Sequence, residues 1–234
     1  MTSNALDVRV YPIAEPQGNT LAFASISIDD LAAIRGIRVV DSKKGMFVTM
    51  PQSKDNEGNY RDIAFPLNGD LRKEIGNTIL AEYKKQSSLS PDQRGYAKPD
   101  KDMTSEISAD DVKLDVKVYP IAEPKGDTLA FAGIGLDGVV AIRGIRIINS
   151  DKGMFVSMPQ SKGKDNQYYD VAFPLSGDLR KAISSAVLDG FKQQAAEHKQ
   201  GIGERLAEGK AQAAQNAANA PARSAAKKAP GLGE

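Results

Sequence analysis

Apolar and polar residues alternate from the start of the chain. Leu6, Val8 and Val10 alternate with polar neighbours, and residues 21–28 continue with small and β-branched side chains. A period of two residues is typical of strands that bury one face. The pattern therefore predicts two strands, at residues 6–10 and 21–28.

Three further strands are expected at residues 34–41, 46–50 and 60–65. The first two are separated by Ser42-Lys-Lys-Gly45, which has the composition of a hairpin turn with a glycine that can take a positive φ. Pro51 ends the ladder because proline lacks the amide that a strand donates. The polar residues that follow, up to Asn59, are expected to form a loop.

The apolar period becomes helical after residue 69. Leu71, Ile75, Ile79 and Tyr83 lie four residues apart, which places them in one stripe along a helix. Asn68 precedes this segment and is a competent N-cap, because its side chain can accept a hydrogen bond from a free backbone amide. A helix that packs one face on the sheet is therefore predicted.

The whole pattern is duplicated. Residues 6–85 recur without a gap as residues 114–193, with Ser176 at the second N-cap position. Two copies are too few for a solenoid, which needs about three, so a pseudo-twofold pair is expected. The predicted class is α+β: each copy forms an antiparallel sheet of four to five strands with one C-terminal helix. Pairing within one chain and pairing between chains both remain open.

Two segments lie outside the copies. Residues 86–113 are rich in Ser, Pro, Asp and Lys, the composition of a flexible linker. Residues 194–234 form a tail rich in Ala, Lys and Gln, which we expect to be partly helical or disordered.

Charge and composition exclude several classes of protein. The net charge is +1, cysteine is absent, and no run approaches the roughly 18 apolar residues of a membrane helix. We therefore expect a cytoplasmic protein without membrane contact. A nucleic-acid partner would have to be held by a local basic patch, with modest and salt-sensitive affinity.

Candidate catalytic and cofactor motifs fail on context. The glycines of residues 133–138 match the GxGxxG pattern, but a dinucleotide site needs a helix after this string, and the next segment is predicted to be a strand. The single histidine, His198, has no serine or carboxylate constellation around it in the sequence. We expect no enzyme activity, cofactor or metal.

Basic residues are the remaining candidates. Arg35 and Arg38 are three residues apart in a strand, so they are expected on opposite faces and in structural roles. A second group is expected to converge at one end of the domain, next to Tyr60, where it could contact phosphates and bases. The candidate binding residues are Lys54, Arg61, Arg72 and Lys73 in the first copy and Lys162, Lys164, Arg180 and Lys181 in the second.

Two strings give the chain a resemblance to a known family. Gly-Met-Phe-Val-Thr-Met-Pro ends at Pro51 and Arg-Asp-Ile-Ala-Phe-Pro ends at Pro66, and copy two repeats both closely. Together with the helix they resemble the SpoVG family, stage V sporulation protein G. The resemblance covers both repeats and leaves the linker and the tail outside.

The resemblance implies a bacterial cytoplasmic protein whose small domain forms a homodimer, binds DNA and RNA, and regulates gene expression in connection with septation and sporulation. In that family the loop and strand before the helix, and the helix itself, carry the basic contacts. Arg61 and Lys54 match basic positions of the family motif. Ser53 replaces another such position, and Tyr169 stands in copy two where copy one has Arg61.

Two hypotheses follow. The first is a non-enzymatic nucleic-acid-binding regulator in which the copies reproduce the family dimer, with the better binding face in copy one. The second is a protein-interaction or structural module that kept the fold and lost nucleic-acid binding; the near-neutral charge favours it.

Overall fold

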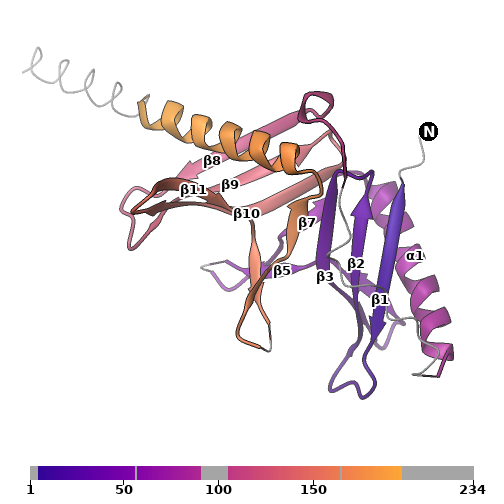
Figure 1. Cartoon of the computed structure of the whole chain (residues 1–234). Helices are drawn as coiled ribbons and strands as arrows, with labels where there is room; N and C mark the ends of the chain where they lie inside the picture. Colours follow the sequence, from indigo (N-terminus) through magenta and orange to yellow (C-terminus); the bar gives the residue numbers. More distant parts are fainter. Residues whose placement is uncertain (1–4, 56, 91–104, 164, 197–234) are drawn as a thin grey trace, which may run out of the picture. The chain divides into compact units, whose positions relative to one another are not determined.

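Each repeat builds one antiparallel sheet, shown in the computed structural model in Figure 1. The structure describes residues 5–55, 57–90, 105–163 and 165–196 of the 234-residue chain. In the first repeat β1 (Leu6–Pro12), β2 (Thr20–Ile28) and β3 (Ala32–Val40) are neighbours in that order, and β4 (Phe47–Thr49) pairs with β3.

The second repeat follows the same plan. β8 (Leu114–Pro120), β9 (Thr128–Leu136) and β10 (Val140–Ser150) are neighbours, and β11 (Gly153–Ser157) continues the sheet beyond β10. Gly45, in the turn before β4, and Gly153, the first residue of β11, have φ of 106° and 107°. The positive φ predicted for Gly45 is therefore confirmed.

The fifth strand of each sheet comes from the other repeat. β7 (Ala64–Pro66) pairs with β10, and β14 (Ala172–Pro174) pairs with β3 (Figure 1). The pairing is equivalent in the two directions, because Ala64 lies opposite Ile142 and Ala172 opposite Ile34. The two repeats are thus joined within the chain by exchanged strands.

A small hairpin precedes each exchanged strand. β5 (Gln52–Lys54) pairs with β6 (Tyr60–Asp62), and β12 (Gln160–Lys162) pairs with β13 (Tyr168–Asp170). The loop predicted directly after Pro51 was therefore wrong. The single strand predicted at residues 60–65 is divided at Ile63, whose amide donates to the carbonyl of Pro51 at 2.8 Å.

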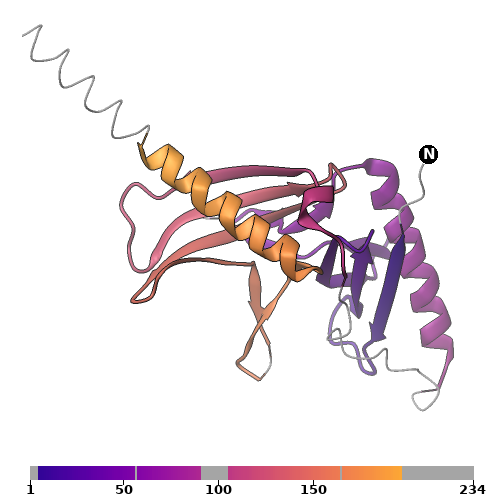
Figure 2. The same ribbon diagram turned by 45° about the horizontal axis from the view of Figure 1, so that its top comes forward.

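Both predicted helices are present. α1 (Gly69–Ser88) begins after Asn68, whose side chain accepts from the Asp70 amide at 2.8 Å. A second helix occupies residues 177–196 of the described chain and crosses one face of β8, β9 and β10 (Figures 1 and 2). Ser176 caps it by accepting from the Leu179 amide at 3.4 Å.

One continuous core runs through both repeats. It includes Ile75 and Ile183 from the two helices and Ala64 and Ala172 from the exchanged strands, all fully buried. The exchange therefore joins two small cores into one, which relieves the marginal stability expected of a single 80-residue domain. The architecture is α+β, as predicted.

A β-bulge corrects the prediction for two arginines. The β2 to β3 register shifts between Ala24 and Ile26, and Gly36 inside this bulge has φ of 72°. The extra residue moves the following side chains to the other face. Arg35 and Arg38 consequently lie on the same face, away from the helix, rather than on opposite faces. An equivalent bulge occurs at Gly144 in β10.

The segment between the repeats is only partly described. Residues 91–104 lie outside the described residues, whereas the 3-10 helix η2 (Ala109–Asp111) leads into Val112, which is buried in the core. His198 and the rest of the chain after residue 196 also lie outside the described part. Among the described helices, neither is long and apolar enough to cross a membrane.

Candidate nucleic-acid interface

The hairpin of the first repeat places a cation against an aromatic ring. Lys54 and Tyr60 lie directly opposite each other in β5 and β6. The Lys54 ammonium is 5.2 Å from the centre of the Tyr60 ring, and Tyr60 is 63% exposed. Such a pair offers a phosphate-binding charge and a stacking surface at one point.

Arg61, on the same hairpin, is held by a carboxylate of its own loop. Its Nε donates to Asp55 Oδ2 at 2.7 Å. Asp55 also accepts from the backbone amides of Asn59 and Glu57, at 2.9 and 3.0 Å. The bond from Arg61 and these two amides lower the pKa of Asp55 below its ordinary value. Arg61 therefore shapes the loop as well as supplying charge.

Asp62 ties the hairpin to the start of α1. It accepts from the Gln52 amide group at 2.9 Å and forms an ion pair with Arg72. Lys73, next to Arg72, lines a shallow groove between α1 and β4 together with Phe47. The candidate residues of copy one thus lie on two neighbouring elements, connected through Asp62.

The second repeat reproduces this connection. Arg180 Nη2 contacts Asp170 Oδ2 at 3.1 Å, and Gln160 donates to the same carboxylate at 3.0 Å. Lys162 lies opposite Tyr168 in the hairpin. Lys181 pairs with Asp178 at 3.1 Å on the exposed helix surface. Lys164 lies outside the described residues.

The loop of the second hairpin is built differently. Tyr169, at the position of Arg61, donates its hydroxyl to Asp165 Oδ2 at 2.5 Å. This bond lowers the pKa of Asp165 and raises that of Tyr169. Gly163 permits the arrangement, because a Cβ at this position would lie 2.8 Å from the Tyr169 ring. Copy one has Asp55 there instead.

The candidate cations are exposed, and several are already paired. Exposed ion pairs contribute little to stability and exchange readily with competing anions. Phosphates would therefore compete directly with Asp55, Asp62 and Asp170 for their arginines. No cluster of His, Cys, Asp and Glu suited to a metal ion occurs among the described residues.

Sequence reasoning missed a second basic and aromatic surface, on the sheet face that neither of the described helices covers. In the second repeat Tyr119, Phe131 and Arg146 lie directly opposite one another across β8, β9 and β10. The signal was the glycine between Arg143 and Arg146, because an isolated glycine within a strand often marks a bulge.

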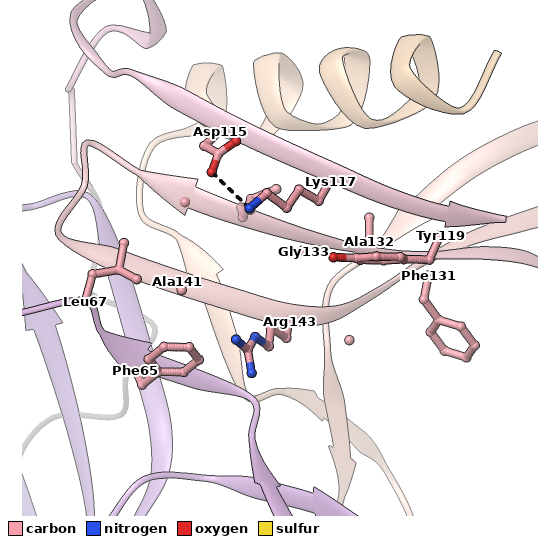
Figure 3. A pocket seen from close by; sticks show the side chains of 13 residues that line it. Phe65, Leu67, Asp115, Lys117, Tyr119, Phe131, Ala132, Gly133, Ala141 and Arg143 are labelled. Atoms are coloured by element: carbon pink, nitrogen blue, oxygen red, sulfur yellow. Dashed lines mark ion pairs between the residues drawn. The ribbon is translucent and has the colours of Figure 1, made fainter. Parts of the chain in front are cut away.

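A shallow hollow of about 360 Å³ lies on this face. Figure 3 shows Arg143 beside Phe65 at one end and Phe131 at the other. The Arg143 guanidinium lies 4.7 Å from the centre of the Phe65 ring. Lys117 on β8 forms a long ion pair with Asp115, with 4.0 Å between Nζ and Oδ2. The exchanged strand β7 therefore supplies part of the wall.

A family model and several named relatives match the sequence. The SpoVG family model matches residues 3–85 and 112–193, more than half of the chain. Relatives described as septation protein SpoVG align over about the length of one repeat. The protein of Agathobacter rectalis is 44% identical over 78 residues, which cover 33% of this chain and 88% of the relative. That of Myxococcus xanthus is 39% identical over 82 residues, 35% and 81% of the two chains.

A third relative, from Staphylococcus aureus, is 36% identical over 102 residues, which cover 44% of this chain and 93% of the relative. Between 81% and 93% of each of these relatives is thus covered by less than half of this chain. Because the family model matches twice in succession, the chain is a tandem duplication of the family's domain, and it belongs to the SpoVG family.

Proposed function

We propose that the chain is a non-enzymatic, cytoplasmic nucleic-acid-binding regulator of bacterial septation and gene expression. The observation that carries the proposal is the pair of hairpins, each of which presents a lysine opposite an exposed tyrosine. These pairs are Lys54 with Tyr60 and Lys162 with Tyr168, the two tyrosines being 63% and 65% exposed. Lysine neutralises phosphate, and tyrosine stacks on any base.

The arginines at the helix starts support this arrangement. Arg72 and Arg180 hold the hairpin bases through Asp62 and Asp170, so the hairpins are fixed to rigid elements. Fixed contacts to phosphates orient a nucleic acid without reading its sequence. We therefore propose binding of modest affinity and low sequence specificity.

The test is a binding titration against labelled DNA and RNA of random sequence over a salt series. Affinity should fall steeply with salt, and Lys54→Ala should reduce the slope of log K against log salt by about one unit. Lys43→Ala removes the same charge from the turn before β4 and serves as the control. Absence of binding at low salt would contradict the proposal.

Arg61→Ala should weaken binding more than Lys54→Ala. The substitution removes one cation, as Lys54→Ala does, and it also removes the side-chain hydrogen bond to Asp55 that holds the hairpin loop. The double variant Asp55→Asn/Arg61→Ala separates the two contributions, because it removes the carboxylate as well.

A protein-interaction module is the second candidate. The observation that favours it is the pairing of Arg61, Arg72 and Arg180 with carboxylates of their own chain, which lowers the net positive potential of the hairpins. Protein partners that stay bound after nuclease treatment and are released by Tyr60→Ala would support this function. Release by nuclease alone would exclude it.

A further inference from the structure

The helix-free face of the second sheet combines stacking rings with cations. Tyr119 and Phe131 are opposite neighbours and are 59% and 46% exposed. Arg146 follows in the same row on β10. Directly opposite side chains in a sheet lie about 5 Å apart at Cβ, so the row forms one surface.

The charges on this face favour an anionic occupant. Lys117, Arg143 and Arg146 contribute three cations, and Asp115 is the carboxylate that lines the hollow with them. Within the described part of the chain, neither Arg143 nor Arg146 has a carboxylate in ion-pairing distance. The face is therefore positive in a protein whose net charge is only +1.

The face is continuous with the proposed hairpin site. A second hollow, of about 260 Å³, is lined by Phe131, Arg146 and Tyr168. Phe131 thus borders both hollows, and Tyr168 belongs to the hairpin that carries Lys162. A continuous row of aromatic and basic side chains consequently extends from the β12 to β13 hairpin to Tyr119.

The equivalent face of the first repeat is less open. Its row is Tyr11, Phe23 and Arg38, but Ser25 and Ser27 beside it are buried, whereas Gly133 and Gly135 in the second repeat are not. The side chain of Arg9 is 17% exposed and that of its counterpart Lys117 is 69% exposed. The open platform therefore belongs to the second repeat.

From this geometry we infer that the helix-free face of β8, β9 and β10 binds single-stranded nucleic acid, with bases stacked on Phe131 and Tyr119 and phosphates held by Arg146, Arg143 and Lys117. The inference rests on the proposed function and adds a surface and a strand preference to it. Single strands fit because their bases are free to stack, while those of a duplex are already stacked on each other.

The experiment compares the full-length protein with Tyr119→Ala/Phe131→Ala. The probes are a fluorescein-labelled single strand of mixed sequence, its duplex, and an abasic strand that has the same phosphates without bases. The wild type should prefer the single strand. The double variant should bind it about a hundredfold more weakly, because it loses two stacking contacts that each correspond to about tenfold.

The abasic strand isolates stacking from charge. It should bind the wild type and the double variant equally, because neither complex contains a stacked base. Tyr119→Phe keeps a ring and should bind as the wild type does. Thermal unfolding of each variant controls for folding, which half-exposed side chains affect little.

Three results would overturn the inference. Unchanged single-strand binding by the folded double variant would remove the face from the site and leave the proposed function intact. No binding of any nucleic acid at low salt would remove both. Self-association of the wild type that the double variant loses, without an effect on the single strand, would assign the face to a second copy of the chain.

Discussion

The two sheets have the same strand order, whereas the loops of the two hairpins are closed by different side chains. Both hairpins are tied to a helix start by the same glutamine, aspartate and arginine contacts, yet one loop is closed by Arg61 on Asp55 and the other by Tyr169 on Asp165. The carboxylate that closes the second loop lies two positions later, where copy one has Glu57, and Gly163 stands at the position of Asp55. The scaffold is thus held by buried packing, which tolerates little change, whereas exposed loops accept a different solution.

The largest effect should come from the shared core. Ile75→Ala and Ile183→Ala truncate equivalent, fully buried side chains on the two helices. Each should lower the free energy of unfolding by about 2 to 5 kcal/mol. Urea unfolding should show one transition in both variants, because the core is continuous. Two separate transitions, with only one shifted in each variant, would show that the repeats fold independently.

The next largest effect concerns the two sheet faces. Phe23→Ala and Phe131→Ala remove rings of nearly equal exposure, 47% and 46%. Phe131→Ala should weaken single-strand binding by about tenfold, and Phe23→Ala by clearly less, because its surroundings are more covered. Anisotropy titrations of the two variants measure the difference. Equal losses would mean that both faces bind.

The two hairpins should respond differently to alkaline pH. The hydrogen bond from Tyr169 to Asp165 raises the pKa of Tyr169. The contribution of this bond to folding stability is therefore fully present below the ordinary tyrosine pKa, and it is lost as pH rises through the raised value. The first hairpin has Arg61 instead of a tyrosine at this position. Amide signals of the β12 to β13 loop should therefore shift at alkaline pH while those of the β5 to β6 loop hold. Tyr169→Phe should abolish the shift.

Acid should affect both hairpins alike. The pKa values of Asp55 and Asp165 are lowered, by hydrogen bonds from Arg61 and Tyr169 respectively. Their contribution is present above the unfolded-state pKa and is lost as pH falls through the lowered values. Loop amide signals of the two hairpins followed by NMR should change over this acidic range. A change in only one hairpin would contradict the equivalence of the two carboxylates.

The smallest effect is expected from exchanging one loop for the other. Gly163→Asp/Tyr169→Arg gives copy two the acidic and basic positions of copy one. Because such pairs are exposed, unfolding free energy should change by less than about 1 kcal/mol. Gly163→Ala alone should displace the Tyr169 ring and return the Tyr169 pKa toward its ordinary value. Absorbance titration measures this. An unchanged Tyr169 pKa would show that the ring can accommodate a Cβ at position 163 without losing its hydrogen bond to Asp165.

The candidate site was predictable only in part. Lys54, Arg61, Arg72 and Lys73 were identified as neighbours, and the structure places them on the hairpin and the helix start. Their carboxylate partners were not foreseen, because Asp62 is ten residues from Arg72 and meets it only when the hairpin folds against α1. Ion pairs of this kind depend on side-chain geometry that a sequence pattern does not contain.

The sequence by itself determined the duplication, the alternating strands, the helices with their caps and the α+β class, because these follow from local periodicity and repeat spacing. Only the tertiary structure decided which sheet each three-residue strand joins and which face each arginine occupies. The local sequence pattern of β7 and β14 would be the same whether each strand paired with the sheet of its own repeat or, as observed, with the sheet of the other repeat. One bulge residue, Gly36 or Gly144, reverses the face of every side chain after it.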